Sequence, residues 1–292
     1  MMNRFNLGSL LLLALALMFG VAHNARAAEG YDNCTGFITS LPTVITTSGT
    51  WCLKQDLSTA MTSGNAITIN TSNVTIDCDD FKIGGLAGGI GTQANGIVAG
   101  NRLNTTIRHC NIRGFFIGLL LFGGSSSGHV IEDNRFDNNT WIGLRVDGDG
   151  SVVRRNRVFD TGGSTVPGVT SVGIGTTSSV DVLDNMVSGV MARSGSGADA
   201  TGIATNSNAS GSVSNNSVRG VLKDGVGVAR GIANTVSGRI TLRDNDLLGD
   251  ASAGSIGLSC DNSTTRALNN VSNGFVTGLN GCVDDGGNVV AP

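Results

Sequence analysis

The sequence contains little proline, few aromatic residues and few charges. Of its 292 residues, 3 are proline, 4% are aromatic and 14% are charged, whereas an ordinary globular domain carries roughly 25% charged residues. Collagen is excluded because proline is almost absent and the 44 glycines follow no three-residue period. The hydrophobic content of 40% excludes a disordered polar tail. The core must therefore be built from small aliphatic side chains in a glycine-rich chain, and this combination points to a repeat.

No apolar run is long enough to cross a membrane comfortably. The run Leu10–Met18 follows Arg4 and precedes the small-x-small sequence Ala25-Arg26-Ala27. This is the pattern of a secretory signal peptide, so we expect residues 1–27 to be removed and the mature chain to be exported, to the periplasm or to the medium. A retained anchor is the alternative, which the cleavage sequence disfavours. We expect no membrane span once the signal is removed.

Positive charge is scarce in the mature chain. Without residues 1–27, which contain two arginines and no acidic residue, 17 basic residues stand against 22 acidic ones, a net charge of −5. The three lysines that remain are Lys54, Lys82 and Lys223. A nucleic-acid partner is disfavoured because no basic stripe is present to neutralise phosphates.

All six cysteines follow residue 27. Six cysteines permit fifteen pairings, and the sequence alone does not choose among them. Metal binding is the alternative, but the chain has no C-x-x-C sequence and no cluster of histidines. We therefore predict disulfides, and neither a metal site nor a cofactor. The closeness of the cysteines along the chain favours three pairs: Cys34 with Cys52, Cys78 with Cys110, and Cys260 with Cys282.

A short pattern, apolar-x-x-Asn-x-apolar, recurs along the chain. Its five regular copies have the anchor residues Asn134, Asn156, Asn185, Asn216 and Asn245. Two earlier copies place Asp79 or Cys110 at the anchor, and a degenerate last copy surrounds Asn270. The spacings between successive anchors are 31, 24, 22, 29, 31, 29 and 25 residues. A constant local pattern with a variable period predicts one structural unit that carries loops of different lengths.

A second element, glycine followed by an aliphatic residue, recurs from Gly96-Ile97 to Gly257-Leu258. The segments between these elements are short and alternate with period two, which predicts β-strands. Coils of such strands can stack about 4.8 Å apart and satisfy one another's backbone. We expect each anchor asparagine to adopt the left-handed conformation at a bend and to bond the asparagine one coil away. Glycine would permit the next bend.

These patterns resemble the right-handed parallel β-helix proteins of the pectate-lyase-like superfamily, over about residues 64–282. The resemblance implies an all-β, single-stranded, right-handed parallel β-helix of about eight coils, which we assign to residues 64–292. Residues 28–63 resemble the entry segment of exported bacterial β-helix-repeat proteins and are expected to cap the first coil. A leucine-rich or hexapeptide solenoid is the alternative, but neither has this asparagine pattern with such variable spacing.

The resemblance also implies a substrate cleft along the sheet that follows the glycine-aliphatic element. Near the middle of that face the charged outward positions are Arg145 and Asp147, and Lys223 or Arg193 could reach in from loops. These four are the catalytic candidates, with a lysine or arginine as base beside a uronate carboxylate. The alternative is that Arg145 and Asp147 are solvated surface charges.

A more conspicuous charged set lies just before the anchors. Stacked coils would bring together one column of Asp77, Arg108, Glu132 and Arg154, and a second that includes His109, Asp133 and Arg155. The functional interpretation is a polar groove with His109 and Asp133 as an acid–base pair. The structural interpretation is a ladder of alternating charges, which stacking alone would favour.

The sequence predicts an exported protein with a long polar face. A glycosidase needs clustered carboxylates and a calcium-dependent lyase needs converging oxygen ligands, and the sequence shows neither arrangement. We therefore favour a non-catalytic surface, matrix or polysaccharide-binding protein whose partner is a polysaccharide outside the cell or in its envelope. The alternative is a lyase, epimerase or hydrolase acting on uronate-containing polymers. The sequence indicates no oligomeric state.

Overall fold

The computed structural model describes residues 31–206, 210–236, 238–260 and 264–291. The chain divides into two units, Met1–Asp32 and Asn33–Pro292, and the fold below is that of the second. The predicted signal peptide, residues 1–27, lies outside the described residues. The described helices are two single turns of 3-10 helix, η1 (Tyr31–Asn33) and η2 (Leu86–Gly88). None of the described helices is long and apolar enough to cross a membrane.

The strands of the described residues form three sheets, all of whose pairings are parallel, with 11, 10 and 10 strands. Sheet A contains β1 (Gly36–Phe37), β3 (Gly49–Cys52), β6 (Val74–Asp77), β9 (Thr105–Arg108), β12 (Val130–Glu132), β15 (Ser151–Arg154), β18 (Val180–Leu183), β21 (Ser210–Ser214), β24 (Arg239–Arg243), β27 (Arg266–Leu268) and β30 (Val283–Asp284). Sheet B contains β2 (Thr43–Ile45), β5 (Asn65–Ile69), β8 (Asn95–Gly100), β11 (Ile117–Phe122), β14 (Ile142–Asp147), β17 (Ser171–Thr177), β20 (Ala200–Thr205), β23 (Ala229–Asn234), β26 (Ile256–Cys260) and β29 (Thr277–Asn280). Sheet C contains β4 (Leu57–Ser58), β7 (Lys82–Gly84), β10 (Asn111–Arg113), β13 (Arg135–Asp137), β16 (Arg157–Gly162), β19 (Met186–Met191), β22 (Ser217–Leu222), β25 (Asp246–Leu248), β28 (Val271–Asn273) and β31 (Val289–Ala291).

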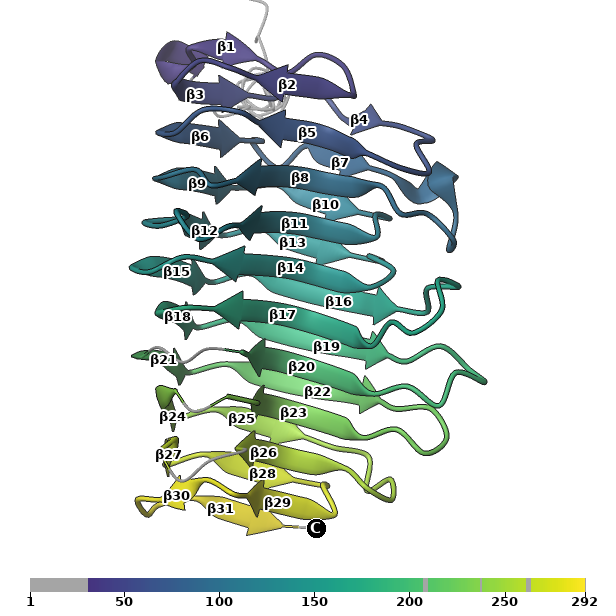
Figure 1. Ribbon diagram of the computed structural model, residues 1–292, viewed down its shortest axis with the longest axis vertical. Coiled ribbons are helices and arrows are strands. Elements are labelled where there is room, and N and C mark those ends of the chain that lie inside the picture. Colours follow the sequence, from purple (N-terminus) through teal and green to yellow (C-terminus); the bar gives the residue numbers. More distant parts are fainter. Residues whose placement is uncertain (1–30, 207–209, 237, 261–263, 292) are drawn as a thin grey trace, which may run out of the picture. The chain divides into compact units, whose positions relative to one another are not determined.

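From β3 to β29, each coil contributes one strand to sheet A, then one to sheet C and one to sheet B, and successive coils stack (Figure 1). The all-β parallel β-helix predicted from the repeat is confirmed. Strands β1–β4 precede the eight predicted repeats, and β30 and β31 follow them. The described part of the expected cap thus adds strands to all three sheets. Its role in sealing the first coil remains a prediction.

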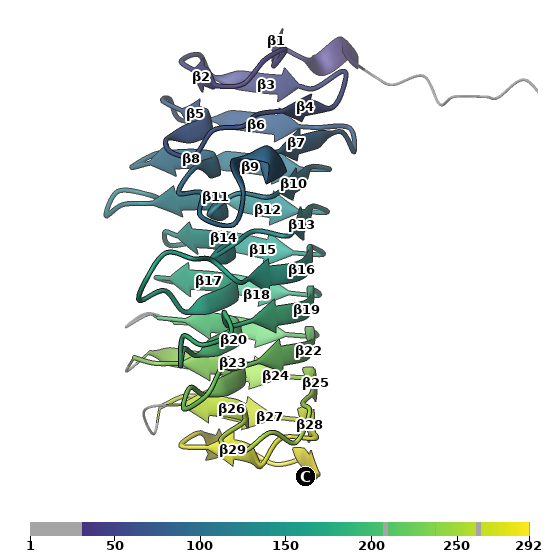
Figure 2. The same ribbon diagram turned by 90° about the vertical axis from the view of Figure 1, so that its right-hand side faces the viewer.

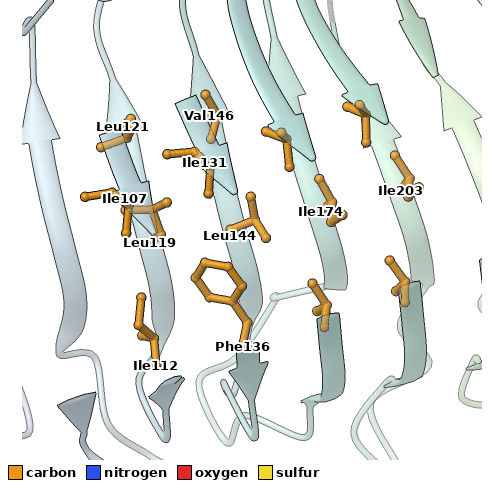
Figure 3. Close-up of a cluster of buried hydrophobic side chains, with 14 of the residues drawn as sticks. Ile107, Ile112, Leu119, Leu121, Ile131, Phe136, Leu144, Val146, Ile174 and Ile203 are labelled. Atoms are coloured by element: carbon orange, nitrogen blue, oxygen red, sulfur yellow. The ribbon is translucent and has the colours of Figure 1, made fainter. Parts of the chain in front are cut away.

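The interior is a set of stacked aliphatic columns, one or more from each sheet (Figure 3). Ile107 and Ile131 come from sheet A, Leu119 and Leu144 from sheet B, and Phe136 from sheet C, all with no exposed surface. Alternation along each strand sends these side chains inward and their neighbours outward. Because coils of three short strands enclose a narrow space, small aliphatic residues fill it, which explains the low aromatic content.

The anchor asparagines form a continuous hydrogen-bonded ladder at the turn between sheets A and C. The backbone N–H and the Nδ2 of Asn134 both donate to Oδ1 of Asn156, at 3.1 and 3.0 Å. Nδ2 also donates to the carbonyl of Ile107 on the previous coil. The same arrangement repeats from Asn156 through Asn185, Asn216, Asn245 and Asn270 to Asn288.

The left-handed residue in this turn is not the anchor, so that expectation was wrong. The residue before the anchor has the positive φ: 56° at Asp133, 54° at Arg155 and 57° at Asp184. The anchor side chain must point inward to reach the next asparagine, so the sharp change of direction falls one residue earlier, where the side chain faces outward.

The first copy of the repeat was also misaligned by placing Asp79 at the anchor. Ile76 pairs with Ile107 in sheet A, and Ile83 pairs with Ile112 in sheet C. The turn between β6 and β7 therefore has two more residues than the turn between β9 and β10, and Asp79 and Asp80 both take positive φ values there. The position that meets Cys110 is Cys78, through a disulfide.

The recurring glycines do not supply a left-handed bend either. Gly118 and Gly143 lie within strands of sheet B, and neither has a positive φ. A Cβ atom on Gly118 would lie 2.4 Å from the carbonyl oxygen of Gly143, and one on Gly143 would lie 2.5 Å from that of Gly173. Glycine is required because successive coils approach too closely at this column for any side chain.

The six cysteines form three disulfides: Cys34–Cys52, Cys78–Cys110 and Cys260–Cys282. These are the pairs that sequence proximity favoured. Their sequence separations are 18, 32 and 22 residues, about one coil each. Each bond therefore links neighbouring coils.

Candidate functional site: a polar groove along sheet C

Arg145 and Asp147, the catalytic candidates on sheet B, bind each other. Arg145 pairs in register with Leu120 on one side and Gly175 on the other. Its Nε and Nη2 donate to the two carboxylate oxygens of Asp147 at 3.2 and 3.1 Å, and Asp147 is 8% exposed. This bidentate ion pair neutralises both charges. Arg145 could act as a base only if the pair were first broken.

The other two candidates, Lys223 and Arg193, donate hydrogen bonds to carbonyl groups of loops. Lys223 Nζ donates to the carbonyl of Gly225. Arg193 Nη1 donates to the carbonyl of Thr165 at 3.4 Å, and Arg193 lines a hollow of about 240 Å³ with Ser164 and neighbouring loop residues. Within the described residues, no hydrogen bond or ion pair joins either side chain to Arg145 or Asp147. Their catalytic role remains a prediction.

The charged column on sheet A contains two ion pairs. Asp77 pairs in register with Arg108, Arg108 with Glu132, and Glu132 with Arg154. Arg108 Nε lies 2.7 Å from Asp77 Oδ2, and Arg154 Nη2 lies 2.7 Å from Glu132 Oε2. Opposite charges on adjacent parallel strands attract, so stacking accounts for this column.

The second column, at the turn, is paired in the same way. Arg155 Nη2 lies 2.7 Å from Asp133 and 3.0 Å from Glu132. The hydrogen bond from Arg155 lowers the pKa of Asp133, and the same bond raises the pKa of Arg155. His109 Nδ1 lies 3.1 Å from Asp77. His109 therefore contacts Asp77, while Asp133 is held by Arg155.

Beside this turn, two adjoining hollows form one groove on the outer face of sheet C. Their volumes are about 300 and 370 Å³, and both are lined by Asp80, Asn111 and Arg135. The groove crosses β7, β10, β13 and β16, which stack in succession (Figure 2). The first hollow is also lined by Cys110, Asp133, Asn134, Arg155 and Arg157, and the second by Asp56, Lys82, Arg113 and Asp137.

The floor of the groove follows from strand register. Lys82, Asn111, Arg135 and Arg157 pair in one column across the four strands. Residues one position further along each strand, such as Ile112, are fully buried. The column residues must therefore face outward, with a backbone spacing of about 4.8 Å.

Most charges along the groove are compensated. Asp137, 8% exposed, lies 3.6 Å from Arg113 and 3.4 Å from Arg135. The Arg135 guanidinium also lies over the ring of Phe159, 4.5 Å from its centroid. Lys82 lies 3.0 Å from Asp56. The buried Nε of Arg113 makes no hydrogen bond.

The charged side chains of Arg157 and Asp80 also line the groove, but among the described residues they are not part of this network. Arg157 pairs through its backbone, but within the described residues its guanidinium has no hydrogen bond or ion pair. The carboxylate of Asp80 has none there either. In all, five cationic side chains (Lys82, Arg113, Arg135, Arg155, Arg157) face four carboxylates (Asp56, Asp80, Asp133, Asp137) in a chain that is negative overall.

Guanidinium, amide and carboxylate groups in a shallow row can donate to and accept from sugar hydroxyls and oxyanions. The sequence reasoning missed Asp80, Asn111, Arg113, Arg135, Asp137 and Arg157. A signal for two of them was present: Arg135 and Arg157 both occupy the variable position directly after the anchor asparagine.

No protein-family model and no curated protein matches the chain. Solved structures that resemble it include the Dettilon tailspike protein, at 13% identity over 79% of this chain and 62% of that one, with a TM-score of 0.40. A mutant tailspike protein of E. coli bacteriophage HK620 in complex with a pentasaccharide matches at 11% identity over 90% and 57% of the two chains, with a TM-score of 0.42. A Geobacillus virus E2 protein, ORF18, matches at 11% identity over 87% and 54%, with a TM-score of 0.21.

The chain spans less than two thirds of the length of each of these three proteins. At such identities and TM-scores, their activities do not transfer to it. None of the three names is that of the pectate-lyase-like superfamily, so membership of that superfamily remains a prediction.

Proposed function

We propose that this is an exported, non-catalytic protein that binds a polysaccharide along the groove on sheet C. The observation that carries the proposal is the continuity of the two hollows, which share Asp80, Asn111 and Arg135 and extend over four successive strands. Three disulfides with no free cysteine support an oxidising destination outside the cytosol.

A polymer fits this groove better than a compact ligand. The groove runs from coil to coil, so each successive coil adds a side chain that can contact a ligand lying across the strands. The lining is polar and charged, as the hydroxyl-rich surface of a sugar chain requires. Small-molecule sites are instead concave and mostly apolar.

The proposal is tested by glycan-array binding of the mature protein and of Asn111→Trp. Asn111 lies at the centre of the column and lines both hollows. A tryptophan there should fill the groove and weaken binding by about tenfold or more, the effect of losing a central contact.

The matched control is Ser217→Trp, which places the same side chain further along the same column of sheet C, beyond the residues that line the groove. Equal binding by both variants would place the ligand elsewhere on the molecule.

A second experiment tests the proposal that the protein is not catalytic. The mature protein is incubated with uronate polymers, and the absorbance of unsaturated ends and the release of reducing sugar are measured. Turnover abolished by Arg145→Ala or Lys223→Ala would establish instead a lyase, epimerase or hydrolase.

A further inference from the structure

We infer that Arg135 and Arg157 form a subsite for an oxyanion, the carboxylate or sulfate of an acidic polysaccharide, within this groove. The inference rests on the proposed function and deepens it by naming the class of polymer.

The two arginines are direct neighbours of like charge. Arg135 on β13 pairs in register with Arg157 on β16, so their backbones lie about 4.8 Å apart and their side chains leave the same face. Like charges directly opposite on neighbouring strands destabilise a sheet. In the column on sheet A, by contrast, Asp77, Arg108 and Glu132 alternate in sign from coil to coil.

Neighbouring groups compensate the positive charge of Arg135 but not that of Arg157. The guanidinium of Arg135 lies 3.4 Å from the carboxylate of Asp137 and over the ring of Phe159. The nearby Arg155 does not need a ligand, because it binds both Asp133 and Glu132. Arg157 has no such group among the described residues, although it lines the hollow together with Arg135. The unmatched charge therefore lies in the groove itself.

An oxyanion between the two guanidinium groups would remove their repulsion. Each guanidinium presents paired donors that match the oxygens of a carboxylate or a sulfate. Asn111 is the next residue in the column and could donate to a neighbouring hydroxyl. Asp80, which lines the same hollow, could accept a hydroxyl. The lining thus combines anion recognition with sugar recognition, as a charged polysaccharide requires.

The test compares binding of polygalacturonate, dextran sulfate and neutral dextran by affinity electrophoresis and calorimetry. We expect one or both anionic polymers to bind, the preferred one showing whether the group is a carboxylate or a sulfate. Arg157→Gln should weaken that binding about tenfold, the loss of one charge-assisted hydrogen bond. Arg157→Lys should restore it only in part, because an ammonium lacks the paired donors.

The control is Arg219→Gln, which removes the same charge from β22 on the same sheet, outside the groove. It should leave binding unchanged. Without polymer, Arg157→Gln should unfold at the same temperature as the wild-type protein or higher, because it relieves repulsion, so weaker binding could not be attributed to misfolding.

The possible failures are distinct. Dextran bound as tightly as the anionic polymers, with no effect of Arg157→Gln, would overturn the oxyanion subsite and leave polysaccharide binding intact. If Arg157→Gln and Arg219→Gln weakened polymer binding equally, the effect would come from the net charge of the protein, and the subsite would also be overturned. Absence of binding to every glycan on the array would overturn the proposed function, and the subsite with it.

Discussion

Surface arginines in this protein have different roles because their partners differ. Arg145 binds a carboxylate two residues along its own strand. Arg155 binds carboxylates one coil away. Arg157, two residues after Arg155, has no partner among the described residues and is available to a ligand. The residue type is the same in all three cases, and the carboxylates within reach, on the same strand or on the neighbouring coil, distinguish a structural charge from a candidate binding group.

A second residue of special interest is His129, which is completely buried at the turn between sheets B and A. Its Nδ1 accepts the backbone N–H of Thr105 at 3.2 Å, so Nε2 carries the proton and can donate to Ser126 Oγ at 3.2 Å. Burial lowers the pKa of His129 from 6.5 to about 4, although Asp147 acts in the opposite direction. The histidine is thus a neutral structural group.

We predict that the protein loses stability as the pH falls from about 6.5 to about 4. In that interval the unfolded chain protonates His129 and the folded chain does not, so the free energy of unfolding decreases, by at most about 1.4 kcal/mol per pH unit from this group. Chemical denaturation at several pH values measures the slope. The carboxylates with lowered pKa values, Asp133 among them, lose their contribution only at lower pH.

His129→Asn should show a flatter slope over the same interval. If His129→Asn does not fold, an NMR titration of His129 in the wild-type protein replaces it. A midpoint near 6.5 in the folded state would contradict the prediction.

At the scale of the strand, the glycine column of sheet B sets how closely the coils approach. Gly118, Gly143 and Gly173 each face the carbonyl oxygen of the next glycine, too close for a methyl group. A Cβ on Gly143 would also meet a Val158 methyl group at 2.7 Å. The column therefore couples the spacing within sheet B to the packing of sheet C behind it.

We predict that Gly143→Ala destabilises the protein by about 2 kcal/mol, because the clash is with backbone, which can move only if the coils separate. The free energy of unfolding in denaturant measures the loss. Gly124→Ala is the control, since a Cβ there meets nothing within 4 Å and its φ is not positive. Equal stability of the two variants would show that the column is not a close-packing constraint.

At the scale of the whole β-helix, each coil contacts mainly its neighbours, as the sheet order shows (Figure 1). Stability in such a stack is approximately a sum of coil and interface terms. A disulfide between neighbouring coils should then act locally. The bonds Cys34–Cys52 and Cys260–Cys282 lie in the first and last coils and are placed to oppose fraying from either end.

We therefore predict that replacing Cys260 and Cys282 by alanine increases amide hydrogen exchange in β29–β31 and leaves β5–β9 unchanged. The bond closes a loop whose cross-link is worth about 3 kcal/mol by chain entropy, and that loss should be confined to the end coils. Replacing Cys34 and Cys52 should have the mirror effect, with faster exchange in β1–β4. A uniform increase along the chain would show that the stack unfolds as one cooperative unit.

Much of the fold could be predicted because the repeat is local. The spacing of the anchors predicts the length of each coil, and the alternation along each strand predicts which residues face inward. The closeness of the cysteines in the sequence predicts the disulfides, as with Cys78 and Cys110. The errors were local as well. The sequence shows that a bend occurs near each asparagine, but which residue takes the left-handed conformation depends on where its side chain must reach.

The candidate site was less predictable than the fold. Arg145 and Asp147 were singled out for their charge, yet in the structure they bind each other. Arg135 and Arg157 passed unnoticed, because their proximity depends on coils that are 22 residues apart in sequence. Asp80 lies in the groove because the turn between β6 and β7 has two additional residues, and Asn111 lies there through its register with Lys82.

The sequence by itself determined the parallel β-helix repeat and the residues of its interior, because these depend on short-range periodicity and on backbone conformation. Only the tertiary structure decided which outward charges pair and which remain free. Pairing depends on side chains that meet across coils, and loops of variable length set which residues those are. The unmatched Arg157 in the groove is a property of the stacked coils, and no single repeat contains it.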